Sequence, residues 1–183
     1  MSVVALCALK QFDWAPPIAG KPMKKILFSL LVGMILGTGI GFALGIFVYP
    51  YIFLADIVAK EQLLDTDKSE LLAEGQFIHA NPSDPIHYGS GSVKVYGNVI
   101  HLQEDFKVGP GPAYHVYLVP EAEVTPDTKV AETMFIDLGR LRAFKGSQVY
   151  SIPSGVDPKT YPNVVVWCEH FGVLISPAKL TFR

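Results

Sequence analysis

The stretch NVVVWCEHF, residues 163–171, places Cys168 beside an acid and a histidine, His170. If residues 164–170 form a strand, alternate side chains point to opposite faces, so Cys168 and His170 lie on the same face. Their Cα atoms would then be about 6.5 to 7 Å apart. An imidazole at that distance can lower the pKa of the thiol, or both groups can bind one soft metal ion. The same pattern also fits a small apolar cysteine that fills space at the end of a strand.

A copper-like ion normally needs another ligand besides these two, and four other histidines could supply it. They are His79, His87, His101 and His115. The second cysteine, Cys7, lies on the other side of a long apolar segment. If that segment crosses a membrane, the two cysteines cannot form an intramolecular disulfide. Cys168 is then a leftover thiol in a compartment that is usually oxidising.

The apolar segment, residues 26–55, contains no charged residue and is long enough to cross a bilayer with some tilt. Three lysines within residues 21–25 precede it, and Asp56 follows it. Because positive charge stays on the cytoplasmic side, residues 1–25 are predicted to be cytoplasmic and the C-terminal part extracytoplasmic. The sequence thus predicts a single-pass protein of the cell membrane, held in the lipid bilayer by an uncleaved signal anchor.

A cleaved signal peptide is the alternative, since MKKILF, which begins at Met23, has the basic start of such a peptide. The apolar stretch is longer than a typical signal-peptide core, and no clean A-x-A site follows it. The same motif raises the hypothesis that Met23 is the true first residue. N-terminal mass analysis of the native protein would test this hypothesis.

Four glycines recur every fourth residue in the predicted span: Gly33, Gly37, Gly41 and Gly45. On a helix this spacing forms a groove without side chains, where another helix can approach closely. The stripe predicts a homo-oligomer or a membrane partner, which crosslinking along the helix would test. Glycine is also common in membrane helices that have no such role.

Residues 56–74 mix charges with scattered leucines and predict a short amphipathic stalk helix. From residue 75 to 183 the pattern changes to short β-branched or aromatic runs separated by Gly, Pro, Asn and Asp. About seven or eight such runs predict an all-β domain, an antiparallel sandwich or barrel. The dipeptide Gly97-Asn98 between Tyr96 and Val99 predicts a two-residue hairpin turn.

Charge in the predicted β domain is balanced, with nine Lys and Arg against ten Asp and Glu from residue 75 onward. No basic stripe is present to follow a phosphate backbone, which argues against a nucleic-acid partner. The sequence contains no phosphate-binding loop with its lysine, no G-x-S-x-G motif and no H-E-x-x-H motif. The common enzyme signatures are therefore missing, and Cys168 with its neighbours is what remains.

Four longer motifs occur in order along the predicted β domain: HYGSGSVKVY, LQEDFKVGPGPAYHVYL, FIDLGRLRAFKGSQVYSIP and YPNVVVWCEHFGVLISPAKL. Together with the GQF at Gly75 they make residues 75–182 resemble the DM-thirteen domain. The resemblance implies a β-rich extracytoplasmic module that takes part in electron transfer with a redox partner protein. It places the characteristic cysteine of the family at Cys168 and makes His87, which precedes the Ser-Gly repeat, the predicted neighbour of that cysteine.

Three functions follow from these observations. In the first, Cys168 with His87 and His170 accepts an electron or holds a copper-like ion. In the second, the domain is a non-catalytic module that binds a protein or a glycan through its loops, and Cys168 is buried and inert. In the third, the chain is a structural tether whose purpose lies in the glycine-lined helix. The sequence identifies no substrate, electron donor or metal.

Overall fold

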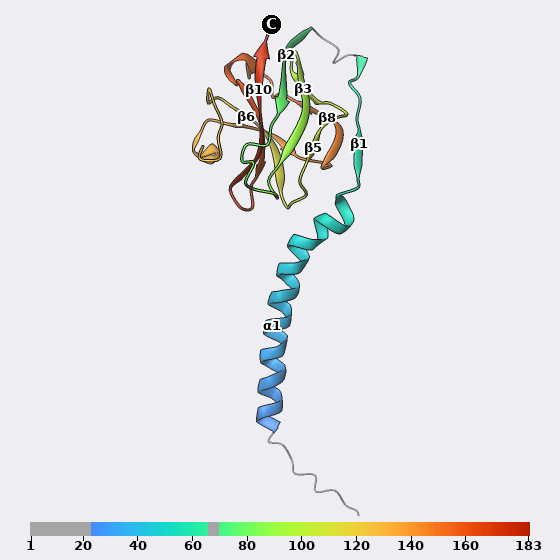
Figure 1. Cartoon of the computed structure of the whole chain (residues 1–183), viewed down its shortest axis with the longest axis vertical. Coiled ribbons are helices and arrows are strands. Elements are labelled where there is room, and N and C mark those ends of the chain that lie inside the picture. The colour runs from blue at the N-terminus through green and yellow to red at the C-terminus, as the bar shows by residue number, and fades with distance from the viewer. Residues whose placement is uncertain (1–22, 66–69) are drawn as a thin grey trace, which may run out of the picture. The chain divides into compact units, whose positions relative to one another are not determined.

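The computed structural model describes residues 23–65 and 70–183, and its chain divides into two compact units at Gly41 and Phe42. Helix α1 runs from Met23 to Tyr49 and continues as a π-helical turn, Pro50–Leu54 (Figure 1). Proline has no backbone N–H, so the regular helical ladder is interrupted where the wider turn begins. Residues 23–54 are long and apolar enough to cross a membrane. The helix predicted for the span is confirmed, whereas Cys7 and the N-terminal segment lie outside the described residues.

The rest of the chain is mostly β-sheet, which confirms the predicted all-β class. Within the described residues the ten strands are β1 (Val58–Lys60), β2 (Leu71–Phe77), β3 (Gly89–Tyr96), β4 (Val99–Leu102), β5 (Lys107–Val108), β6 (Tyr114–Val119), β7 (Ile136–Arg140), β8 (Lys145–Ser151), β9 (Asn163–Cys168) and β10 (Val173–Phe182). Short 3₁₀ turns at Val130–Glu132 and Pro158–Thr160 interrupt the loops. The strand order is β1-β8-β4-β3-β2-β10-β9-β6-β7, and β5 pairs with β3 and β8.

Neighbouring strands are antiparallel except for the parallel pair β1 and β8. The predicted hairpin is confirmed, because Tyr96 pairs with Val99 across the two-residue turn. Gly97 in that turn has a φ of 52°, which glycine adopts without a steric cost.

The predicted stalk helix is wrong for the described part of residues 56–74. Residues 58–60 form strand β1 on the edge of β8, and β2 already begins at Leu71. The Ser147 hydroxyl donates to the Glu61 carbonyl (2.7 Å), and the Arg142 guanidinium binds the Glu61 carboxylate with two nitrogens. Pairing with distant residues therefore overrides the weak helical pattern of this segment.

The sheet separates two clusters of buried side chains, because alternate residues of a strand point to opposite faces. On β9, Val164, Val166 and Cys168 belong to the main core, to which strands from both ends of the sheet contribute. Val165 and Trp167 belong to a smaller cluster on the other face, together with Tyr117 of β6. Each strand of this part of the sheet thus supplies side chains to two separate environments.

Candidate functional site

Cys168 is the last residue of β9 and is a free thiol with only 1% of its surface exposed. Its Sγ donates a hydrogen bond to the Pro112 carbonyl oxygen at 3.2 Å. Burial raises the pKa of the thiol, although the backbone N–H groups of Phe171 and His170 oppose this shift. At neutral pH the sulfur is therefore a protonated thiol and not the reactive thiolate.

A mostly apolar cavity of about 440 Å³ adjoins this sulfur. It is lined by Tyr51, Ile86, His87, Pro110, Gly111, Pro112, Tyr114, Cys168, Phe171 and Val173. Cys168 and His87 are far apart in the sequence, yet both line this cavity. Among the described residues that line it, His87 has the one basic side chain.

The loop before β3 fixes the orientation of the His87 ring. His87 Nδ1 lies 2.6 Å from Asp84 Oδ2, while Asp84 Oδ1 accepts the backbone N–H groups of Ile86 (2.9 Å) and His87 (3.1 Å). The His87 side chain, helped by these two N–H groups, lowers the pKa of Asp84 to about 2. The carboxylate is thus ionised at neutral pH and accepts the Nδ1 proton. In the neutral imidazole, Nε2 then carries the lone pair that can take up a proton.

His170 lies outside this arrangement. The strand predicted to reach residue 170 ends at Cys168, because Gly172 donates its N–H to the Cys168 carbonyl (2.8 Å) and the chain turns into β10. Gly172 has a φ of 62°, which favours glycine in this turn. His170 is exposed in the turn, and its ring packs edge-on against Phe171, with centroids 4.8 Å apart.

The donor atoms of the predicted copper-like site do not converge on one point. Cys168, His87 and His170 do not form a group whose donor atoms all lie within 4.8 Å of one another. A soft-metal site needs such convergence, because metal–ligand bonds are only about 2.0 to 2.3 Å long. The three predicted ligands therefore do not fit a shared metal ion in this structure.

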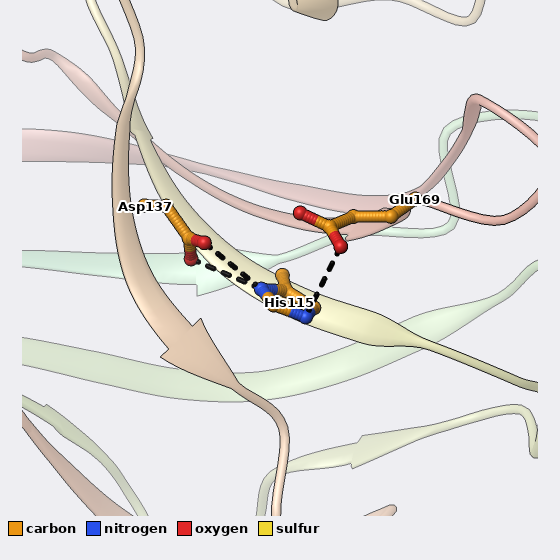
Figure 2. Close-up of side chains that lie close together, drawn as sticks. All are labelled: His115, Asp137 and Glu169. Carbon is orange, nitrogen blue, oxygen red and sulfur yellow. Dashed lines mark hydrogen bonds and ion pairs between the residues drawn. The ribbon is translucent and has the colours of Figure 1, made fainter.

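A different cluster, which the sequence did not predict, lies on the other face of the sheet. Figure 2 shows the His115 ring between the carboxylates of Asp137 and Glu169. Nδ1 is 3.0 Å from Asp137 Oδ2, and Nε2 is 3.3 Å from Glu169 Oε2. Each carboxylate faces a different ring nitrogen: Asp137 is hydrogen-bonded to Nδ1, and Glu169 lies at ion-pair distance from Nε2. No spacing in the sequence could indicate it, because the three residues come from separate segments.

The glycine stripe of α1 has open space around it. A Cβ atom built at Gly33, Gly37, Gly41 or Gly45 would have no other described atom within 4 Å, apart from its own neighbours in the helix. The packing role predicted for the stripe stays a prediction.

Comparison with known proteins gives one match. The family model described as "Electron transfer DM13" matches residues 82–180, more than half of the chain. The matched segment includes Cys168, His87 and the His115 cluster but leaves out β1 and β2, although β2 lies between β3 and β10 in the sheet. No curated protein and no solved structure matches. From the match over this length, we identify the chain as a member of the DM13 family of electron-transfer domains.

Proposed function

We propose that this chain is a membrane-anchored electron-transfer module whose redox site is Cys168 in the apolar cavity, with His87 as proton acceptor. The family match supports electron transfer as the activity. The observation that carries the choice of site is that Cys168 and His87 line the same cavity although about 80 residues separate them. An apolar cavity with a few polar groups is a common form of functional site.

The protonated state of the thiol determines the chemistry. When Cys168 gives one electron to the oxidised centre of a redox partner, its S–H bond must break as well. The electron goes to the partner, the proton goes to the His87 imidazole, and a neutral thiyl radical remains. The reverse step returns both to the sulfur. The Asp84 carboxylate, which holds His87 through Nδ1, stabilises the imidazolium that forms.

Electrochemistry of the full chain in detergent, adsorbed on an electrode, tests this proposal. We expect a redox wave that Cys168→Ser abolishes and that Cys7→Ser, the matched control, leaves unchanged. His87→Asn should slow electron transfer at least about tenfold, as removal of a general base does. A wave of unchanged size in Cys168→Ser would overturn the proposal.

A second candidate, a non-catalytic module that binds a protein or a glycan, is favoured by the burial of Cys168 and its bond to the Pro112 carbonyl. In that case the cysteine contributes packing, and Cys168→Ser lowers the stability of the domain without changing any electron transfer. The electrochemical experiment thus separates the two candidates, provided that the unfolding of each variant is measured beside it.

We further propose that the β domain lies outside the cytoplasm, which the lysines before the apolar segment support. Ser154 is exposed in the turn after β8, so a cysteine there can react. With Cys7 replaced by serine, Ser154→Cys should react with a membrane-impermeant maleimide in intact cells. In the chain that keeps Cys7 and Ser154, labelling should require permeabilised cells. Labelling of Ser154→Cys only after permeabilisation would place the domain in the cytoplasm instead.

A further inference from the structure

The phenol of Tyr117 is buried on the face of the sheet opposite to Cys168. Its side chain belongs to the smaller cluster, and the residue is 3% exposed. The hydroxyl donates to Glu169 Oε1 at 2.6 Å, which is the short distance expected for a hydroxyl bound to a carboxylate. Strand β6 carries Tyr117 and β9 ends just before Glu169, and these two strands pair. The contact is therefore built into the sheet.

Tyr150, a second buried tyrosine, differs from Tyr117 in the groups that accept a hydrogen bond from its hydroxyl. Tyr150 is 2% exposed, and its hydroxyl donates to the amide oxygen of Gln148 (3.0 Å) and the carbonyl of Arg140 (3.3 Å). Both acceptors are neutral and too weakly basic to take a proton. Tyr117, in contrast, donates to a carboxylate, which is a proton acceptor.

The Glu169 carboxylate also contacts His115, which in turn contacts Asp137 (Figure 2). Glu169 Oε2 faces His115 Nε2 at 3.3 Å, and His115 Nδ1 faces Asp137 Oδ2 at 3.0 Å. The side chains of Glu169 and Asp137 are 44% and 39% exposed, whereas that of His115 is 19% exposed. A proton that leaves the buried phenol therefore reaches groups in contact with water. Arg140, opposite His115 in the β6–β7 pairing, is the nearby cation on the adjacent strand.

The surroundings of the ring favour a protected phenol. Phe135 stacks on the Tyr117 ring with centroids 4.3 Å apart and an angle of 21°. Val165 and Trp167 of β9 lie in the same cluster. Burial, followed by the bond to Glu169, raises the pKa of Tyr117, so the phenol keeps its proton at neutral pH until an electron is removed.

We propose that Tyr117 is a redox-active tyrosine and that Glu169 is its proton acceptor. A one-electron oxidant strong enough to oxidise a phenol, the class to which a peroxide-activated haem belongs, takes one electron from the ring. The O–H bond of Tyr117 breaks, and its proton forms an O–H bond with Glu169 Oε1. The products are a neutral tyrosyl radical and a neutral glutamic acid, so no charge is left buried. The inference does not depend on Cys168 and concerns a second site in the same domain.

Flash photolysis of the full chain in detergent tests the inference, with photogenerated tris(bipyridine)ruthenium(III) as the oxidant. The tyrosyl radical is followed by its absorbance and its electron paramagnetic resonance spectrum. Glu169→Gln keeps an oxygen that accepts the hydrogen bond but removes the base, so the tyrosyl radical should form at least about tenfold more slowly. Tyr117→Phe should remove the long-lived part of the radical signal, while Tyr150→Phe, the matched control, should leave it unchanged.

Two results would overturn the inference. One is a long-lived radical of unchanged yield in Tyr117→Phe. The other is an unchanged rate in Glu169→Gln, in a protein whose circular dichroism matches that of the wild type. A purely structural hydrogen bond would change stability but would not change these radical signals. The redox wave assigned to Cys168 is read in a different experiment, so failure at either site does not imply failure at the other.

Discussion

Replacing Gln148 by leucine is expected to lower the free energy of unfolding by about 3 to 5 kcal/mol. Gln148 lies in β8 and is fully buried, with 0% exposure, and its side chain bonds to the turn between β7 and β8. Its Oε1 accepts the backbone N–H groups of Arg142 (2.9 Å) and Ala143 (3.2 Å) and the hydroxyl of Tyr150 (3.0 Å). Its Nε2 donates to the Ala143 carbonyl at 2.8 Å.

Leucine has a similar volume but no polar atom, so it removes all of these partners at once. Each buried group left without a partner costs about 1 to 3 kcal/mol, and partial hydration keeps the sum below the simple total. Urea unfolding of the full chain in detergent, followed by tryptophan fluorescence, measures the loss. Tyr150→Phe is the control, because it removes one of these hydrogen bonds and should cost about 1 kcal/mol. A Gln148→Leu variant no less stable than Tyr150→Phe would contradict this account of the turn.

Replacing Gly91 by alanine is expected to cost about 3 kcal/mol or more. Gly91 lies in β3 with a φ of 108°, a conformation that residues with a Cβ rarely adopt. A Cβ there would lie 2.6 Å from the Asp105 carbonyl oxygen and 2.7 Å from the Phe106 nitrogen. These are backbone atoms, and the loop cannot move away easily, because both Asp105 carboxylate oxygens accept hydrogen bonds from Ser92 (2.9 and 2.8 Å). The variant thus has both conformational strain and a steric clash.

Gly139→Ala separates these two costs. Gly139 has a similar φ of 114°, but a Cβ at this position would meet no atom within 4 Å. The control therefore includes only the conformational strain, about 1 to 3 kcal/mol. Thermal unfolding of both variants gives the comparison, and Gly91→Ala should have the lower midpoint. Equal unfolding midpoints for the two variants would show that the loop at Asp105 moves to accommodate the added methyl group, which would contradict the predicted clash.

The sequence predicted the parts of the fold that are encoded locally. Runs rich in β-branched and aromatic residues, such as residues 163–168 and 173–182, indicate strands. Gly97-Asn98 specifies a hairpin by its backbone preference alone. The helix predicted for residues 56–74 was wrong because the short strand β1 in this segment forms only by pairing with β8, more than 80 residues away. No local pattern in a three-residue strand can reveal such a partner.

The same reason limits what could be predicted of the sites. A family motif identified Cys168 and His87, and both line one cavity. The pairing of Tyr117 with Glu169, 52 residues apart, depends on the register of β6 against β9. A shift of one residue in strand register moves every side chain to the opposite face of the sheet. The sequence of the motif therefore does not determine which side chains are in contact across the two strands. His170 was assigned to the face of Cys168 because the end of β9 could not be located from the sequence.

The parallel attachment of β1 has a consequence for how partners reach this domain. Only residues 55–57 separate the helical turn that ends at Leu54 from β1, and three residues span at most about 10 Å. If α1 crosses a bilayer, as we propose, a linker this short would keep the domain near the membrane surface. In that case we expect its electron-transfer partners to be proteins that come to the same membrane surface.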